Sequence, residues 1–280
     1  VFANKPVDEA LQLLPLLFSI CGRAQAMAGV SAVEHARCLI SDDDTAFTRT
    51  WQIRLEAAQE YLWRLLIDLP NLFGIAPATG ALATLRHGLQ RALTDQSNGG
   101  LRPGVTLERP DAEVRSLAAT RLYTCLETEV LGCPVDDWCA LQDSDDLDRW
   151  LNHAATPVTS ALSRLRQQAL PSRQRIAGLP INHAGWLEEI IEALVSIPRF
   201  QQAPLWRGRC YETGALARCC ERPLIKSLLA SGGDVRLARL VARLLELTDT
   251  VRWLVDEAPI ETHPWLGGGS TGQAAGYGWV

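Results

Sequence analysis

The feature that most constrains the fold is apolar spacing of three and four residues, which recurs along nearly the whole chain. This spacing places apolar side chains on one face of an α-helix, whereas a half-buried strand requires strict alternation. In the range 233–257 the apolar face consists of Leu237, Leu240, Val241, Leu244, Leu245, Val251 and Leu254. No segment of the sequence shows convincing strand alternation, so the sequence predicts an all-α fold, a large helical bundle.

The other helices are predicted from the same spacing and from breakers. One begins at Pro6, continues past Phe18 and carries Cys21 near its middle or at a kink, since Pro15 removes a backbone donor. A second, 45–69, ends at Pro70, and its apolar face is Trp51, Leu55, Ala58, Leu62, Leu65, Leu66 and Leu69. A helix from Pro110 to Gly132 has the face Val114, Leu117, Ala118, Leu122, Leu126 and Val130.

Further helices are expected over shorter ranges: 79–94, ended by the breakers at 97–100, 145–169, 184–197 and 211–231. The glycine-rich stretch 258–280 is expected to be an irregular loop.

Length and composition set the size of the core. The 280 residues are 47% hydrophobic and 21% charged, enough to bury one large core. We therefore expect residues 1–280 to form a single domain. The chain begins at Val1 without a methionine and stops soon after a glycine-rich stretch, so the domain is expected to be truncated at both ends.

Charge and cysteine content exclude several classes of partner. A net charge of −5 with interspersed signs argues against nucleic-acid binding, which needs clustered Lys and Arg. No apolar run reaches the roughly 18 to 20 residues of a membrane helix. Eight cysteines in so long a chain do not suggest a disulfide scaffold, which favours a reduced, cytoplasmic protein.

The usual catalytic motifs are absent from the sequence. It contains no C-x-x-C pair, no G-x-S-x-G and no phosphate-binding loop, and its five histidines are scattered singly. The chemistry of the residues alone therefore indicates no recognisable enzyme.

Three stretches, in the correct order, resemble motifs of nickel-iron hydrogenase large subunits. Cys21-Gly22, followed by the VEHA of 33–36, resembles the first cysteine motif, R-x-C-G-x-C. The segment 211–218, YETGALAR, resembles the E-V-G-P-L-A-R signature. The range 267–278 resembles the glycine-rich approach to the A-P-R-G segment. The resemblance implies a large-subunit-like fold.

The departures from that pattern concern the metal ligands. Ala24 stands where the family has its second cysteine, Ala28 where it has a histidine, and Ser19 where it has an arginine. A chain that keeps one cysteine resembles the HupK/HoxV family of hydrogenase maturation proteins. This resemblance implies a non-catalytic scaffold that transiently holds an Fe(CN)2(CO) unit, without nickel, and passes it on. The implied partners are hydrogenase maturation proteins and the hydrogenase large-subunit precursor.

The candidate site residues come from these motifs. Cys21 is the candidate metal ligand, or alternatively a small core residue. Gly22 either lets the backbone approach the cofactor or relieves crowding. Glu212 and Arg218 are candidate cofactor-binding residues that lie six apart and therefore need not pair with each other, or else they mark an exposed helix start.

Two further positions and two rival functions stay open. Glu34 and His35 are either groups supporting the site or surface positions. The first rival function is a divergent or truncated catalytic large subunit, which needs a second cysteine pair beyond Val280. The second is a metal-free helical chaperone, for which Cys21 is dispensable.

Overall fold

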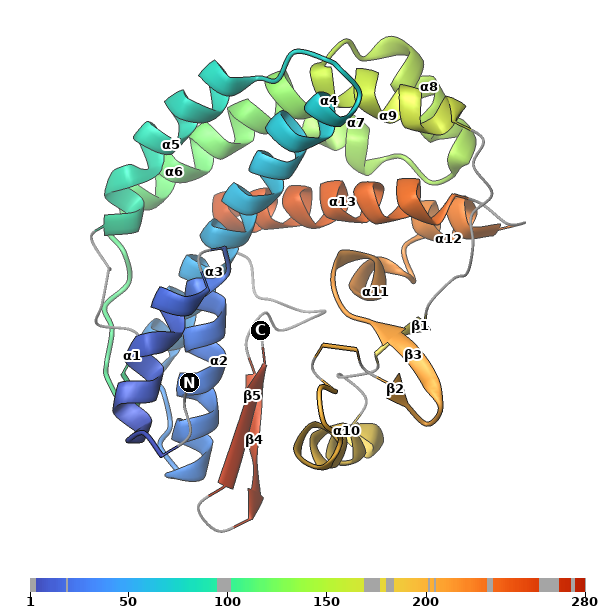
Figure 1. Cartoon of the computed structure of the whole chain (residues 1–280). Coiled ribbons are helices and arrows are strands. Elements are labelled where there is room, and N and C mark those ends of the chain that lie inside the picture. Colours follow the sequence, from blue (N-terminus) through green and yellow to red (C-terminus); the bar gives the residue numbers. More distant parts are fainter. Residues whose placement is uncertain are drawn as a thin grey trace. The chain divides into compact units, whose positions relative to one another are not determined.

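The computed structural model describes residues 4–18, 20–94, 102–168, 177–179, 184–200, 202–203, 205–230, 234–256, 267–272 and 275–279. Most of these residues are helical, which confirms the predicted helical class (Figure 1). The chain divides into two compact units. Unit 1 comprises Val1–Trp63, Gly80–Thr124 and Thr250–Val280, and unit 2 comprises Arg64–Thr79 and Cys125–Asp249. A division into two compact units does not show whether they fold together or separately. The single domain expected for residues 1–280 therefore stays a prediction.

Unit 1 is built around α2, which lies between a helix and a hairpin. Its helices are α1 (Val7–Leu17), α2 (Gly22–Ala36), α3 (Asp43–Trp63), α5 (Thr79–Thr94), α6 (Ala112–Cys125) and the last residues of α13 (Val235–Asp256). Strands β4 (Gly267–Gly272) and β5 (Ala275–Trp279) pair antiparallel and lie along α2 (Figure 1). The chain thus brings residues from its two ends together within this unit.

Unit 2 combines short helices with a small mixed sheet. Its elements are η1 (Arg64–Asp68), α4 (Leu69–Leu72), η3 (Leu126–Leu131), α7 (Val135–Cys139), α8 (Ser144–His153), α9 (Pro157–Gln167), β1 (Ala177–Gly178), α10 (Ala184–Ser196), β2 (Leu205–Trp206), β3 (Arg209–Glu212), α11 (Ala215–Cys219), α12 (Pro223–Leu229) and most of α13. The strand order is β1-β3-β2, with β1 parallel and β2 antiparallel to β3.

Several helix predictions are confirmed. The ranges 79–94, 184–197 and 233–257 correspond to α5, α10 and α13. All seven residues of the apolar face predicted for 45–69 are buried. Of the face predicted after Pro110, only Leu117 is exposed. The breakers at 97–100 lie outside the described residues.

The prediction that Pro70 ends a helix is wrong. The helix of 45–69 passes through the π-helix η1 and continues as α4 to Leu72, with Pro70 in the first turn of α4. A first helical turn has no intrahelical partner for its N–H groups, so proline is tolerated there.

The single helix predicted across Cys21 is wrong as well. α1 ends at Leu17, Phe18 is extended, and a new helix begins at Gly22, so that Cys21 lies before α2 rather than inside a helix. Likewise 145–169 is two helices, because Pro157 starts a new one as the first residue of α9.

The sequence predicted no strands and a single helix over 211–231, and both predictions are wrong. Tyr211 and Glu212 belong to β3, Gly214 turns the chain with φ +121°, and Pro223 starts α12. Glycine adopts such a φ at little cost, and its occurrence here separates strand from helix. Within the stretch 258–280 that was expected to be an irregular loop, β4 and β5 pair antiparallel, and residues 258–266 lie outside the described residues.

Candidate functional site

Cys21 occupies the N-cap position of α2, in unit 1. It is half-buried, so it is not the fully buried core residue that the alternative interpretation describes. Its side chain makes no capping hydrogen bond. The Gln25 amide Nε2, one turn along α2, lies 3.9 Å from Cys21 Sγ. Cys21 thus offers a thiol whose sulfur is not used to cap its own helix. Ser19, the other departure in this motif, lies outside the described residues.

Gly22 is packed against the end of α1. A Cβ atom at this position would lie 3.0 Å from the Pro15 carbonyl oxygen and 3.1 Å from Pro15 Cα. Both of these atoms are backbone, so a side chain would crowd against a part of the chain that cannot rotate away. The relief of crowding is sufficient to explain Gly22, and its role in cofactor binding stays a prediction.

A carboxylate from α3 holds the first turn of α2. Glu56 accepts hydrogen bonds from the backbone N–H groups of Arg23, at 3.0 Å, and Ala24, at 2.9 Å. Burial raises the pKa of Glu56, although these two amides and the nearby Arg23 charge oppose the shift. Glu56 was missed by sequence reasoning, because it lies more than thirty residues from the motif it contacts and has no motif of its own.

The glycine-rich hairpin lies against the middle of α2. A Cβ atom on Gly278 would lie 2.2 Å from the Ala28 carbonyl oxygen and 3.0 Å from Ala32 N. The strand therefore contacts the helix backbone to backbone, which only glycine permits. Ala28, which replaces the family histidine, thus lies at the contact between α2 and the hairpin.

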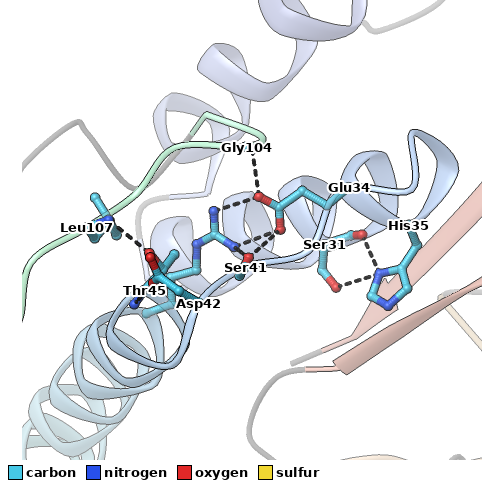
Figure 2. A network of polar contacts seen from close by, with 9 residues as sticks. Ser31, Glu34, His35, Ser41, Asp42, Thr45, Gly104 and Leu107 are labelled. Atoms are coloured by element: carbon cyan, nitrogen blue, oxygen red, sulfur yellow. Dashed lines mark hydrogen bonds and ion pairs between the residues drawn. The ribbon is translucent and has the colours of Figure 1, made fainter.

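The carboxyl-terminal part of α2 carries a buried ion pair (Figure 2). Arg49 donates from Nη1 to Glu34 Oε2 at 2.7 Å and from Nη2 to Glu34 Oε1 at 2.8 Å. Glu34 also accepts from Gly104 N at 2.8 Å and from the Ser41 hydroxyl at 3.2 Å. These partners hold the pKa of Glu34 below its usual range, although burial, the largest single cause, acts to raise it.

Glu34 and His35, the two positions of α2 left open above, both make hydrogen bonds within unit 1. Glu34 joins α2 to α3 and to the segment around Gly104, as described above. His35 Nδ1 donates to the Ser31 carbonyl oxygen at 2.7 Å, one turn back on the same helix (Figure 2). Thirteen residues separate Cys21 from Glu34, about 20 Å at the rise of an α-helix. Both residues are accounted for by structural contacts.

Glu212 and Arg218 lie in unit 2, and both are bound to α13. Arg239 donates to Glu212 Oε2 from Nη2 at 2.7 Å and from Nε at 3.1 Å. Arg218 donates from Nη2 to Glu246 Oε2 at 2.9 Å. Each of the two residues thus has a partner on α13, and Glu212 lies in strand β3 rather than at the start of a helix. Their role in cofactor binding stays a prediction.

Three other thiols are disfavoured as thiolates by burial. Burial raises the pKa of Cys125 and of Cys219 to about 12, and burial also raises the pKa of Cys133. The thiolate is the form that binds metals, so burial disfavours the metal-binding form of these three thiols. Within the described ranges, no group of three or more His, Cys, Asp or Glu side chains could hold a metal ion.

Among the described residues, none forms a helix both long and apolar enough to cross a bilayer.

Comparison with known proteins identifies two curated relatives. The chain is 26% identical over 223 residues to the hydrogenase expression/formation protein HoxV of Cupriavidus necator, covering 77% of this chain and 53% of HoxV. It is 28% identical over 254 residues to the hydrogenase expression/formation protein HupK of Bradyrhizobium diazoefficiens, covering 91% of this chain and 61% of HupK. The chain thus spans little more than half the length of these relatives. No family model matches it. The resemblance to HupK and HoxV inferred from the motifs is confirmed.

Proposed function

We propose, from the similarity to two hydrogenase expression/formation proteins, that this chain is a non-catalytic assembly scaffold in nickel-iron hydrogenase maturation. It transiently binds an Fe(CN)2(CO) unit as cargo through Cys21 and passes it to the hydrogenase large subunit. The observation that carries the proposal is the Cys21 thiol, half-buried at the start of α2 and not used for capping. The partners are other maturation proteins and the large-subunit precursor, in the cytoplasm.

The chemistry of one thiolate suits a carrier. Soft thiolate is a suitable ligand for low-valent iron, and the two cyanides and the carbonyl supply further ligands, so that one protein thiolate can hold the unit while other coordination positions stay open. One protein ligand releases such a unit more readily than the several thiolates of a permanent centre. The family's active site holds nickel with thiolates, and in the first motif of this chain Ala24 stands where the family has its second cysteine. We further propose that the fold is related to that of the large subunit.

The proposal is tested by infrared spectroscopy with iron and nickel analysis. The chain is purified without oxygen from cells that contain the hydrogenase maturation machinery, as wild type and as Cys21→Ala. The matched control is Cys38→Gly, which removes an exposed thiol from the same unit at a position with φ +54°, where glycine is unstrained. Cyanide and carbonyl bands with iron, lost in Cys21→Ala and kept in Cys38→Gly, support the scaffold.

The other outcomes contradict it. Nickel together with iron supports a divergent catalytic large subunit. A wild-type chain that carries neither metal nor bands supports a metal-free helical chaperone. Bands that persist in Cys21→Ala show that the cargo is held elsewhere.

A further inference from the structure

The amino end of α2 requires an acceptor that Cys21 does not supply. The first N–H groups of a helix have no intrahelical partners, and an N-cap Ser, Thr, Asp or Asn side chain usually accepts one of them. Cys21 makes no such bond. A helix end left in this state frays, and residues at the end lose their fixed position.

Glu56 supplies the missing acceptor from a different helix. Its two carboxylate oxygens accept one bond each, from the second and third residues of α2, Arg23 and Ala24. These are the same N–H groups that an N-cap side chain would bind. Glu56 is half-buried in α3, a helix whose apolar face is buried. An ionised acceptor also complements the positive end of the helix dipole.

The turn that carries Cys21 is thus held from two sides. On one side Gly22 packs against the Pro15 backbone, and on the other Glu56 binds the two amides that follow. We propose that Glu56 is a positioning residue that takes over the capping of α2, so that the thiol of Cys21 can face a ligand. The part of this inference that concerns cargo rests on the proposed function, and the capping itself does not.

The capping is tested by amide hydrogen exchange of the first turn of α2 in the full chain. Glu56→Gln keeps the size of the side chain but loses the charge and opposes an amide N–H with its own NH2. We expect exchange at Arg23 and Ala24 to accelerate roughly tenfold, since bonds to charged groups contribute more than neutral ones. The control, Glu113→Gln, removes the same charge from an exposed position of unit 1 and should change nothing there.

Repeating the exchange experiment in a Cys21→Ser variant distinguishes a loss of capping from a general loss of stability. Cys21→Ser introduces a side chain that can itself accept an amide of the first turn. In this background we expect Glu56→Gln to accelerate exchange about twofold or less, since the serine takes over. An equal acceleration in both backgrounds would overturn the capping role, as would Glu56→Gln with unchanged exchange in the wild-type background.

The effect of Glu56 on cargo binding is measured separately, by infrared spectroscopy. If the wild-type chain carries cyanide and carbonyl bands, folded Glu56→Gln should lose them or shift their frequencies, whereas Glu113→Gln should keep both. Unchanged bands in Glu56→Gln would overturn the link between capping and cargo. If the wild-type chain carries no bands, the proposed function fails, while the exchange experiment still decides whether Glu56 caps α2.

Discussion

The two ends of α2 are each held by a glutamate, yet the two carboxylates behave in opposite ways. At the amino end Glu56 binds two backbone amides, and burial raises its pKa. Near the carboxyl end Glu34 binds the Arg49 guanidinium as well as an amide and a hydroxyl, and its pKa is lowered. At Glu34, the bonds to the guanidinium and to the other partners lower the pKa by more than burial raises it. At Glu56, the bonds from two amides do not offset the effect of burial on the pKa. The carboxyl end is held by a buried ion pair, whereas the amino end is held by hydrogen bonds from two backbone amides, beside the cysteine motif.

The largest expected effect is at the carboxyl end. Arg49→Ala leaves the Glu34 carboxylate buried without its cation, and we expect a loss of about 3–5 kcal/mol in the free energy of unfolding. Denaturant unfolding measures this value. The control is Arg37→Ala, which removes an exposed arginine 4.0 Å from Asp8 in the same unit and should cost no more than about 1 kcal/mol. Equal losses in both variants would show that the buried pair does not hold this end.

The middle of α2 provides the next test, because the hairpin contacts it between the two ends. Gly278→Ala places a Cβ atom 2.2 Å from the Ala28 carbonyl oxygen, so the strand must move, at a cost of about 1–3 kcal/mol. Hydrogen exchange should accelerate at residues 28–32 and stay unchanged at both ends of the helix. Gly80→Ala, in α5 with open space around it, should be neutral or slightly stabilising. Accelerated exchange along all of α2 would show that the ends are not held independently.

The smallest expected effect is the pH dependence. Because the folded pKa of Glu34 is lowered, its contribution is present above the ordinary value of 4.5 and is lost as the pH falls through the folded pKa. Because the folded pKa of Glu56 is raised, the folded state binds that proton more tightly, and this contribution decreases as the pH rises from 4.5 through the folded pKa.

The contributions of Glu34 and Glu56 are distinguished by measuring the free energy of unfolding between about pH 3 and pH 7 in the wild type and in two variants. Glu34→Gln should flatten the acid limb below 4.5, and Glu56→Gln should remove the decrease above it. Curves that change in the same direction in both variants would contradict the comparison between the two ends.

Periodic apolar spacing was sufficient to predict the long helices. The range 79–94 and the buried face of 45–69 agree with the structure because amphipathic spacing over several turns is a local property. The glycine-rich hairpin was not predictable in this way. Its strands have few side chains with which to alternate, and their pairing depends on contact with α2, which lies more than two hundred residues away in the chain.

Only the motif residues of the candidate site could be predicted from the sequence. Cys21 and Gly22 were found because adjacent residues carry the resemblance, while Ala24 and Ala28 defined the departure. The partners that hold these motifs are remote in sequence: Glu56 for the cysteine motif, Gly278 for the middle of α2. No spacing rule connects residues that meet only after the chain has folded.

The binding of YETGALAR to α13 has a consequence for how such chains can diverge. Arg239 and Glu246 lie seven residues apart, two turns of one helix, and bind Glu212 and Arg218 with opposite polarity. A change of sign at any one of these four positions places two like charges together, whereas a simultaneous change in both members of a pair restores the attraction. Positions 212 and 239, and likewise 218 and 246, should therefore covary among homologous sequences, so that the motif evolves together with the helix that carries its partners.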